Sequence, residues 1–354
     1  MRKVILAGYF GEGNLGDDAI MGGCLEALHA AQIEPVVMYG GQAGSVQGYA
    51  VRCIPRRTMS AYAQEIQNAD ALVLGGGSIF QDVTSWRSTL YYANLVKVAK
   101  KAGKKVVMLG QGVGPLTHCL GKKAATAAFN AADAIVVRDP GSVQTLKSLG
   151  VKQIPRVGAD MAYLLPNAEP GGAVESFSVG GMPAIGISPR PFGNDDSTIA
   201  LFSDLCSLFI KGKMVPVLIA MDRGEDAKLI AAIREKSGGR IPTLKDITTP
   251  GDFQRQIMRL DGLVAMRLHA GILAACAGTA PFMLSYDPKV SAFSQLMGLP
   301  AAMSMKGISA QRVFDAYASF YEAREKMQRA VTNAVAKQRV EAQKNIDVLL
   351  GCLG

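Results

Sequence analysis

Two basic side chains, Arg267 and His269, stand two positions apart in an otherwise apolar segment. A buried cation without a partner is costly, so both side chains need a polar or anionic partner. On an extended strand end they fall on one face and can hold one small anionic ligand together. The alternative is structural, with the arginine in an ion pair and the histidine hydrogen-bonded to a backbone carbonyl.

Two further arginines follow predicted strands, Arg190 after strand 184–188 and Arg138 after strand 134–137. Guanidinium groups bind carboxylates and phosphates through paired hydrogen bonds. Together with Arg267 they would form a cluster suited to a compact anion with several charges. For Arg138 the alternative is a helix-capping salt bridge involving Asp139.

Glycine-rich segments follow two other predicted strands. Gly75-Gly76-Gly77-Ser78 comes directly after strand 71–74, and Gly110-Gln111-Gly112 comes after strand 106–109. Ligands of open α/β sheets bind at such strand ends, where helix N–H groups are free. Gln81 and Asp82 are expected to project toward the same crevice. No Gly-Lys-Ser/Thr follows, which excludes a P-loop nucleotidase, and plain βα turns are the alternative.

The first predicted strand, 4–7, leads into Gly11-x-Gly13-x-x-Gly16, which formally matches a dinucleotide-binding fingerprint. That fingerprint also needs a carboxylate at the end of the second strand, 35–39, and the chain continues there without one. We therefore expect Asn14 and the glycines to bring the backbone close to another ligand, with Asp17 at the helix start. A tight turn with N-capping acids and no ligand is the alternative.

Continuous apolar strands alternate with helical segments along the whole chain. Such strands indicate parallel sheets covered on both faces. We predict an α/β fold of two Rossmann-like domains facing each other, GT-B-like, with a C-terminal helix packing back. The predicted limits are 1–168 for the first domain, 169–182 for a linker, 183–313 for the second domain and 314–354 for the helical tail. In the second domain we expect strands at 184–188, 215–220, 263–266 and 281–285.

The composition narrows the class of partner. The chain has 354 residues and a net charge of +9, which favours anionic partners. Aromatic residues make up only 6%, too few for a nucleic-acid surface. Three histidines argue against a histidine metal cluster, and six cysteines without a C-x-x-C pair are typical of a cytoplasmic protein. The apolar stretch 270–284 is too short to span a bilayer.

These motifs, taken in order, resemble the polysaccharide pyruvyl transferase family, and within it the bacterial subgroup that acts in cell-wall anchoring of surface-layer proteins. The resemblance rests on Gly8–Gly11, Asn14–Ala19, the segments 75–82 and 110–115, Val137–Asp139, Ile187–Pro191, Met266–Ala270 and Ser285–Val290. One departure is Gly158–Ala162, where the family has Asp-Pro-Ala-Phe, which leaves the role of Asp160 open.

The resemblance implies transfer of pyruvate from phosphoenolpyruvate to a sugar as a 4,6-ketal, with release of phosphate. It ties Arg190, Arg267, Leu268 and His269 to donor recognition and catalysis. Such a mechanism has His269 as general acid, Asp17 or Asp82 as base, and no metal or redox cofactor. By family analogy the acceptor is N-acetylmannosamine of a lipid-linked disaccharide, used by a cytoplasmic enzyme placed peripherally at the inner membrane face.

Two other functions share these sequence features. A sugar-nucleotide glycosyltransferase of GT-B fold would have the same architecture and glycine loops. A non-catalytic cell-wall glycan-binding protein would use the same residues for recognition only. The sequence determines neither the acceptor sugar nor the oligomeric state.

Overall fold

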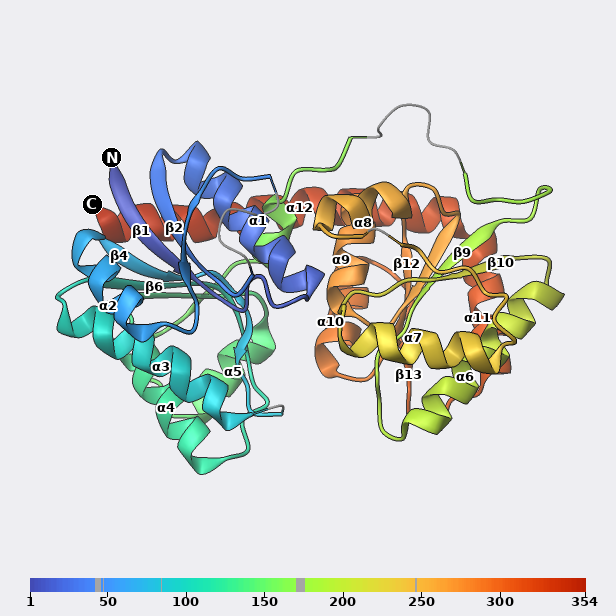
Figure 1. Ribbon diagram of the computed structural model, residues 1–354, viewed down its shortest axis with the longest axis horizontal. Coiled ribbons are helices and arrows are strands. Elements are labelled where there is room, and N and C mark those ends of the chain that lie inside the picture. The colour runs from blue at the N-terminus through green and yellow to red at the C-terminus, as the bar shows by residue number, and fades with distance from the viewer. Residues whose placement is uncertain (42–45, 47, 84, 170–175, 246) are drawn as a thin grey trace. The chain divides into compact units, whose positions relative to one another are not determined.

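The computed structural model describes residues 1–41, 46, 48–83, 85–169, 176–245 and 247–354 (Figure 1). The chain forms two compact units. The first contains Met1–Glu12, Asp17–Pro166 and Gln338–Gly354, and the second contains Gly13–Gly16 and Asn167–Lys337. The predicted domain limits and the linker 169–182 stay a prediction, and residues 170–175 of that linker lie outside the described part of the chain.

The first unit holds a sheet in which eight strands pair in parallel among the described residues, in the order β3-β2-β1-β4-β6-β7-β8, with β5 beside β6. The strands are β1 (Arg2–Ala7), β2 (Ile33–Tyr39), β3 (Arg52–Pro55), β4 (Ala71–Leu74), β5 (Gly77–Phe80), β6 (Lys105–Val113), β7 (Ala134–Val137) and β8 (Arg156–Val157).

Alternate residues of these strands are buried on opposite faces. Ile5, Leu72 and Val106 belong to one apolar core with side chains of the α2, α3 and α4 helices, while their neighbours Leu6 and Val73 are equally buried on the other face. The helices are α1 (Leu15–Ala30), α2 (Met59–Glu65), α3 (Trp86–Lys101), α4 (Cys119–Ala131) and α5 (Pro140–Ser148), with short 3-10 turns η1 (Ile66–Asn68) and η2 (Met161–Leu164).

The second unit repeats this plan with a parallel sheet, ordered β10-β9-β11-β12-β13 among the described residues. Its strands are β9 (Ala184–Ser188), β10 (Val215–Leu218), β11 (Gly262–Ala265), β12 (Pro281–Ser285) and β13 (Met303–Ser304). Its helices are α6 (Asp195–Lys211), α7 (Glu225–Lys236), α8 (Pro250–Ile257), α9 (Leu268–Cys276), α10 (Pro288–Leu296) and α11 (Ala310–Glu322).

The last helix, α12 (Arg324–Leu353), returns the chain to the first unit, which contains its residues from Gln338 onward. Its anchor is Asn345, which is fully buried. The Asn345 Oδ1 accepts from the Gly110 N–H at 2.7 Å, and Nδ2 donates to the Ala159 carbonyl at 3.1 Å. In Figure 1 both chain ends lie in this unit, and Arg2 bonds to the carbonyl of Gly354.

Two predicted loops are wrong in detail. Strand β6 continues through Gly110, Gln111 and Gly112 to Val113, because neighbouring backbone groups pair with this stretch. Likewise Gly77 and Ser78 begin the short strand β5 instead of extending a loop. Within the described residues, every helix is too short or too polar to serve as a membrane span.

Candidate functional site

In the second unit, a buried ion pair holds Arg267 at the end of β11. Its Nε lies 3.0 Å from Asp226 Oδ2, and its Nη2 lies 2.5 Å from Asp226 Oδ1. Asp226 stands in the first turn of α7 and is completely buried, and it also accepts from the backbone N–H groups of Met221 and Asp222. Nη1 of Arg267 has no partner among the residues the structure describes, so one edge of the guanidinium remains for a ligand.

Charge and burial compete at this pair. Burial raises the pKa of the Asp226 carboxyl, and the positive charge and hydrogen bonds of Arg267 oppose that rise. For Arg267, burial by itself lowers the pKa, but Asp226 more than offsets this, so the pKa is raised and the guanidinium stays charged. The structural alternative considered for Arg267 is therefore realised, but it uses only part of the side chain.

Arg190 lies near the end of β9 and stacks on the ring of Tyr286, with 4.1 Å between its Cζ and the ring centroid. Its Nε is buried without a hydrogen-bond partner among the described residues, and so is the hydroxyl of Ser188. Lys289 approaches the same ring, with its Nζ 5.8 Å from the centroid. Polar atoms without protein partners in such a setting need a ligand or water to bond to.

His269 lies in the first turn of α9 and packs against Gly16 of the same unit. A Cβ added to Gly16 would lie 2.4 Å from His269 Nδ1, so only glycine fits beside this ring. Gly16 is held in place because the Asn14 Oδ1 accepts its N–H at 2.9 Å and because the Leu15 N–H donates to the Met221 carbonyl. Asn14 thus caps the N-terminus of α1, and its role in ligand binding stays a prediction.

The expectation that Arg267 and His269 share one face of an extended strand end is wrong. Strand β11 ends at Ala265, Arg267 is the N-cap residue of α9, and His269 is already helical. The chain turns between them, which directs Arg267 to Asp226 and His269 to Gly16. Leu268, between them, is buried. The side chain of the N-cap residue Arg267 makes no capping hydrogen bond to α9, and a helix N-terminus of this kind attracts anions.

In the first unit, Arg138 occupies the equivalent strand end but is satisfied by protein groups. Its Nη1 lies 2.6 Å from Asp160 Oδ2 and its Nη2 donates to Ser78 Oγ at 2.9 Å. Burial alone would lower the pKa of Arg138, but the carboxylates of Asp160, Asp139 and Asp17 raise it. Asp160, left open by the sequence, therefore has a structural role. Whether Arg138 joins Arg190 and Arg267 in one cluster stays a prediction.

The glycines after β4 are required by the backbone. Gly76 and Gly77 have φ of 111° and 79°, and a Cβ at Gly76 would lie 3.0 Å from the Leu109 carbonyl oxygen. A Cβ at Gly77 would lie 3.1 Å from an Asp17 carboxylate oxygen. Gly75 is buried, and its carbonyl accepts from Cys24 Sγ. The half-buried Asp17 therefore lies close to this turn.

Three other predicted site residues form hydrogen bonds to protein groups of the first unit. Gln111 is fully buried, and its Nε2 donates to the carbonyls of Leu74 and Leu109. The Gln81 side chain accepts from the Val83 N–H. The Asp82 carboxylate accepts from the N–H groups of Thr117 and His118, which lower its pKa although partial burial alone would raise it. The loop before α4 thus holds Asp82, and ligand binding by Gln81 and Asp82 stays a prediction.

Sequence reasoning missed three residues of the second unit, Asp226, Tyr286 and Lys289. Tyr286 and Lys289 were part of a quoted motif, so their position after a strand was the available signal. Asp226 gave no signal, because it lies 41 positions from Arg267. Among the described residues, no three His, Cys, Asp or Glu side chains come together as metal ligands.

Three solved structures show which fold this is. HepE of Anabaena in complex with UDP-glucose aligns with a TM-score of 0.67 at 12% identity, over 99% of this chain and 100% of that chain. MnaA of S. aureus with UDP gives 0.65 at 12%, over 99% and 95%. The UDP-GlcNAc 2-epimerase of Neisseria meningitidis bound to UDP-GlcNAc gives 0.63 at 12%, over 100% and 99%. The predicted fold class, two Rossmann-like domains of GT-B type, is confirmed.

The family follows from the sequence match. Among curated proteins, none matches this chain significantly. The family model described as polysaccharide pyruvyl transferase matches residues 14–288. This range includes Asn14, Arg190 and Arg267. The chain belongs to the polysaccharide pyruvyl transferase family.

Proposed function

We propose that this enzyme transfers the pyruvyl group of phosphoenolpyruvate to a sugar of a cell-wall polysaccharide precursor, as a 4,6-ketal, with release of phosphate. The observation that carries the proposal is the set of unmet donors at the strand ends of the second unit. Arg190 Nε and Ser188 Oγ at the end of β9 have no described partner, and Arg267 with its open edge follows the paired neighbouring strand β11.

The donor's chemistry matches this set of groups. Phosphoenolpyruvate carries a carboxylate and a phosphate on a three-carbon frame, so its site needs several cations and N–H donors within a few ångströms. The Tyr286 ring fixes the plane of the Arg190 guanidinium, and Asp226 fixes that of Arg267. Two guanidinium groups held in place can bind two anionic groups with little further loss of side-chain freedom.

The reaction balances with one proton delivered to carbon. The methylene carbon of the donor takes a proton and becomes a methyl group, and positive charge develops at the neighbouring carbon. One sugar hydroxyl attacks that carbon and loses its proton, the bond to the phosphate oxygen breaks, and a second hydroxyl closes the ketal with loss of its own proton. One of the two hydroxyl protons replaces the proton that was delivered to the methylene carbon. The other leaves with phosphate or solvent.

His269 is our candidate for the acid that protonates the methylene carbon, because it follows Arg267 by two residues and an imidazole can donate a proton near neutral pH. Asp226 acts as a positioning residue through Arg267. Asp17 is our candidate for the base, because it is half-buried in the first turn of α1 with a carboxylate oxygen close to the Gly77 turn. Asp82 is less suited, because three donors from Thr117 and His118 already hold its carboxylate.

We assign the acceptor as N-acetylmannosamine of a lipid-linked disaccharide, which places the enzyme in the cytoplasm at the inner face of the membrane. The resemblance to the surface-layer subgroup supports this acceptor. The solved structures of the same fold are described with UDP, UDP-glucose and UDP-GlcNAc, which supports binding of a sugar attached to a diphosphate.

The proposal is tested by measuring whether the enzyme uses phosphoenolpyruvate as its donor. The enzyme is incubated with a synthetic lipid-linked disaccharide and phosphoenolpyruvate, and phosphate release is measured together with an acid-labile gain of one pyruvyl group. We expect both signals in equal amounts, and their absence would contradict the proposal. An Asp17→Asn variant should lose turnover, whereas Asp82→Asn should keep it.

A second function, sugar-nucleotide glycosyltransfer, is favoured only by the fold and by the nucleotide sugars in the solved structures. Replacing phosphoenolpyruvate by UDP-sugars in the same assay separates the two, because a glycosyltransferase would then lengthen the acceptor and release UDP. A glycan-binding protein would show neither product.

A further inference from the structure

The positive charge of this chain is concentrated in one segment. Residues 83–159 contain twelve Lys and Arg and two Asp, whereas the rest of the chain contains 26 Lys and Arg and 27 Asp and Glu. This segment is therefore more positive than the whole protein, whose net charge is +9. The remainder of the chain is close to neutral.

Helices α3, α4 and α5 of the first unit carry much of this charge outward. Helices α3 and α4 pack together, and neither contains an acidic residue. The exposed basic side chains on the three helices, which we call the basic face, are Arg87, Lys97, Lys100, Lys101, Lys122, Lys123 and Lys147.

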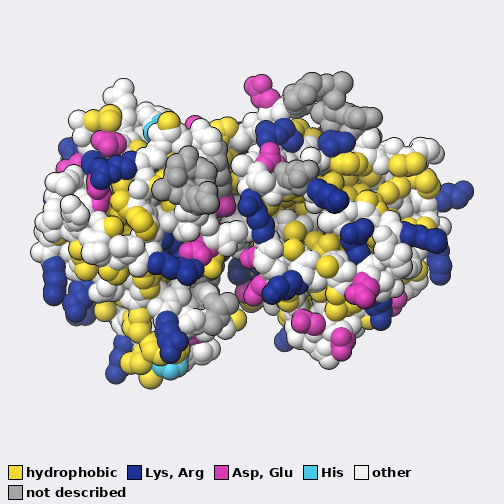
Figure 2. All heavy atoms as spheres, viewed as in Figure 1, with side chains coloured by type: hydrophobic (Ala, Val, Ile, Leu, Met, Phe, Trp, Pro, Cys, Tyr) yellow, Lys and Arg dark blue, Asp and Glu magenta, His cyan; other side chains and the backbone are white. Residues whose placement is uncertain are grey.

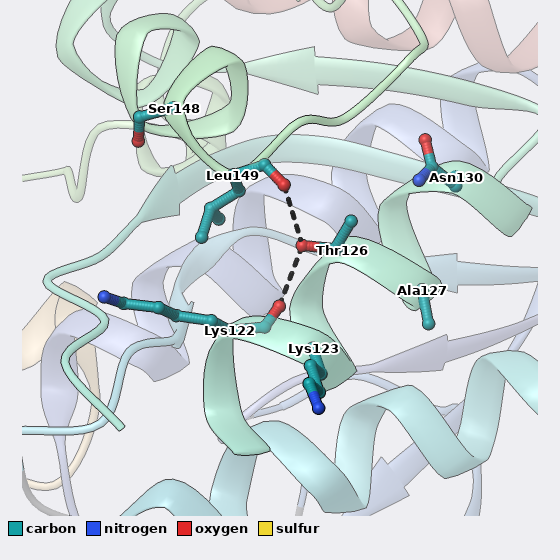
Figure 3. A pocket seen from close by; sticks show the side chains of 7 residues that line it. All are labelled: Lys122, Lys123, Thr126, Ala127, Asn130, Ser148 and Leu149. Atoms are coloured by element: carbon teal, nitrogen blue, oxygen red, sulfur yellow. Dashed lines mark hydrogen bonds between the residues drawn. The ribbon is translucent and has the colours of Figure 1, made fainter. Parts of the chain in front are cut away.

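Two hollows mark the seams between these helices. One of about 690 Å³ lies between α3 and α4 and is lined by Leu90, Lys97, Lys100, Lys101 and alanines. The other, of about 470 Å³, lies between α4 and the end of α5 (Figure 3). There Thr126 bonds to the carbonyls of Lys122 and Leu149, while the Lys122 and Lys123 side chains extend away from these bonds.

Apolar side chains stand among these cations. Val83 is 72% exposed, Leu120 45% and Leu90 38%, and all three belong to α3, α4 or the turn before α3. Figure 2 shows hydrophobic surface bordered by Lys and Arg at the end of the first unit where α4 begins. An exposed apolar patch bordered by lysines is suited to bind a partner surface that carries negative charge above a hydrocarbon layer.

The nearby acids do not neutralise this face. Asp133 pairs with Lys100 and Lys105, Asp82 is held by Thr117 and His118, and Asp139 caps α5. Lys97, Lys101, Lys122, Lys123 and Lys147 form no ion pair with any residue that the structure describes. The charges of these five lysines therefore remain uncompensated on the basic face.

We propose that the basic face is the surface by which this enzyme docks on an anionic phospholipid membrane. This rests on the proposed membrane-bound acceptor and adds which surface meets the lipid. Lipid suits the face better than nucleic acid, because its exposed side chains are aliphatic. The indole of Trp86 already stacks on the His118 ring, with 5.0 Å between centroids and 7° between planes, so it is not offered to a base.

The experiment measures binding of the full chain to vesicles of phosphatidylcholine, with and without about one third phosphatidylglycerol. The test variant replaces Lys97, Lys101, Lys122 and Lys123 by Gln. The matched control replaces four exposed lysines of the second unit, Lys211, Lys228, Lys236 and Lys326, by Gln. Each lysine near an anionic surface contributes about fivefold to binding, so we expect the test variant to lose at least ~10²-fold and the control less than about fivefold.

A Leu90→Ser, Leu120→Ser variant tests the apolar part, and we expect it to lose the binding that remains at high salt. Equal loss in the test and control variants would overturn the proposal, as would binding to duplex DNA as tight as to the anionic vesicles. Pyruvyl transfer to a soluble, lipid-free disaccharide should be unchanged in all three variants. If the wild-type enzyme transfers no pyruvyl group to this disaccharide, the proposed function is rejected. The vesicle measurement still tests whether the basic face binds the membrane.

Discussion

Both units have arginines at the carboxyl ends of sheet strands. Only in the second unit do these arginine side chains keep nitrogen atoms without a described protein partner. In the first unit, Arg138 follows β7 and is bonded to Asp160 and Ser78. In the second unit, Arg190 follows β9 with a buried Nε that has no described partner. Whether a guanidinium at a strand end is satisfied by protein groups thus depends on the acids that surround it, and not on its place in the fold.

Arg267 is intermediate between these two cases. Its Nε and Nη2 are taken by Asp226, and its outer nitrogen is left over. A buried ion pair of this kind contributes little stability by itself. It does hold the guanidinium in one orientation, which is what a small anion requires. The second unit therefore combines one arginine fixed by an acid with one fixed by an aromatic ring.

The largest expected effect is the loss of reaction rate in the His269→Ala variant. Removing a general acid typically costs ~10²- to 10⁴-fold in rate, so phosphate release should fall by about that factor. Binding of phosphoenolpyruvate, measured by calorimetry, should stay within a few-fold, because Arg190 and Arg267 remain. Full activity in this variant would remove His269 from the mechanism.

The next test breaks the comparison directly by removing one arginine from each unit. Arg138→Ala leaves the buried Asp160 carboxylate unpaired, which should lower the free energy of unfolding by ~3–5 kcal/mol. Arg190→Ala should change the unfolding free energy little but raise the KM for phosphoenolpyruvate by at least ~10-fold. Denaturant unfolding and steady-state kinetics on both variants check this, and a reversed pattern would contradict the comparison.

A smaller effect is expected for Gly16→Ala. The new Cβ would lie 2.4 Å from His269 Nδ1, so the ring must move, and kcat should fall by about tenfold or more. Helix propensity favours alanine here by up to ~1 kcal/mol, so a general loss of stability should not accompany the loss of rate. Thermal unfolding in parallel with kinetics separates the two. Gly351→Ala, with open space around its Cβ position, is the control.

The smallest effect concerns Asp82→Asn in the first unit. The pKa of Asp82 is lowered in the folded protein, so its carboxylate stabilises the fold above the ordinary pKa and loses that contribution as the pH falls. The variant should therefore be slightly less stable than wild type at pH 7, and the difference should shrink when unfolding is measured below about pH 3.8. Turnover should be unchanged.

Local patterns predicted much of the fold. The apolar runs at 71–74, 134–137, 184–188 and 281–285 coincide with β4, β7, β9 and β12. Parallel strands buried on both faces are continuous apolar segments, so the pattern along the chain is enough to find them. The extension of β6 through Gly110 to Val113 was missed because glycine gives no strand signal, and pairing with β5 and β7 decides it.

The candidate site could be located from the sequence only in part. Arg267 and His269 were identified as chemistry-bearing residues because cations are rare in apolar segments, and Arg190 because it follows a predicted strand. The pairing of these sites' arginines with Asp226 and Asp160 could not be predicted, because chain folding brings each acid to its arginine over 41 and 22 positions. Gln111 was assigned to a ligand loop, but the structure buries it beneath backbone carbonyls.

By itself, the sequence determined the α/β class, the family and the residues capable of anion chemistry, because hydrophobic periodicity and motif order are local properties of the chain. Only the tertiary structure decided which arginines are satisfied and which retain donors for a ligand. The same holds for the gathering of surface lysines on α3, α4 and α5. Burial and pairing of a charge depend on groups far away in the chain, and no local pattern specifies them.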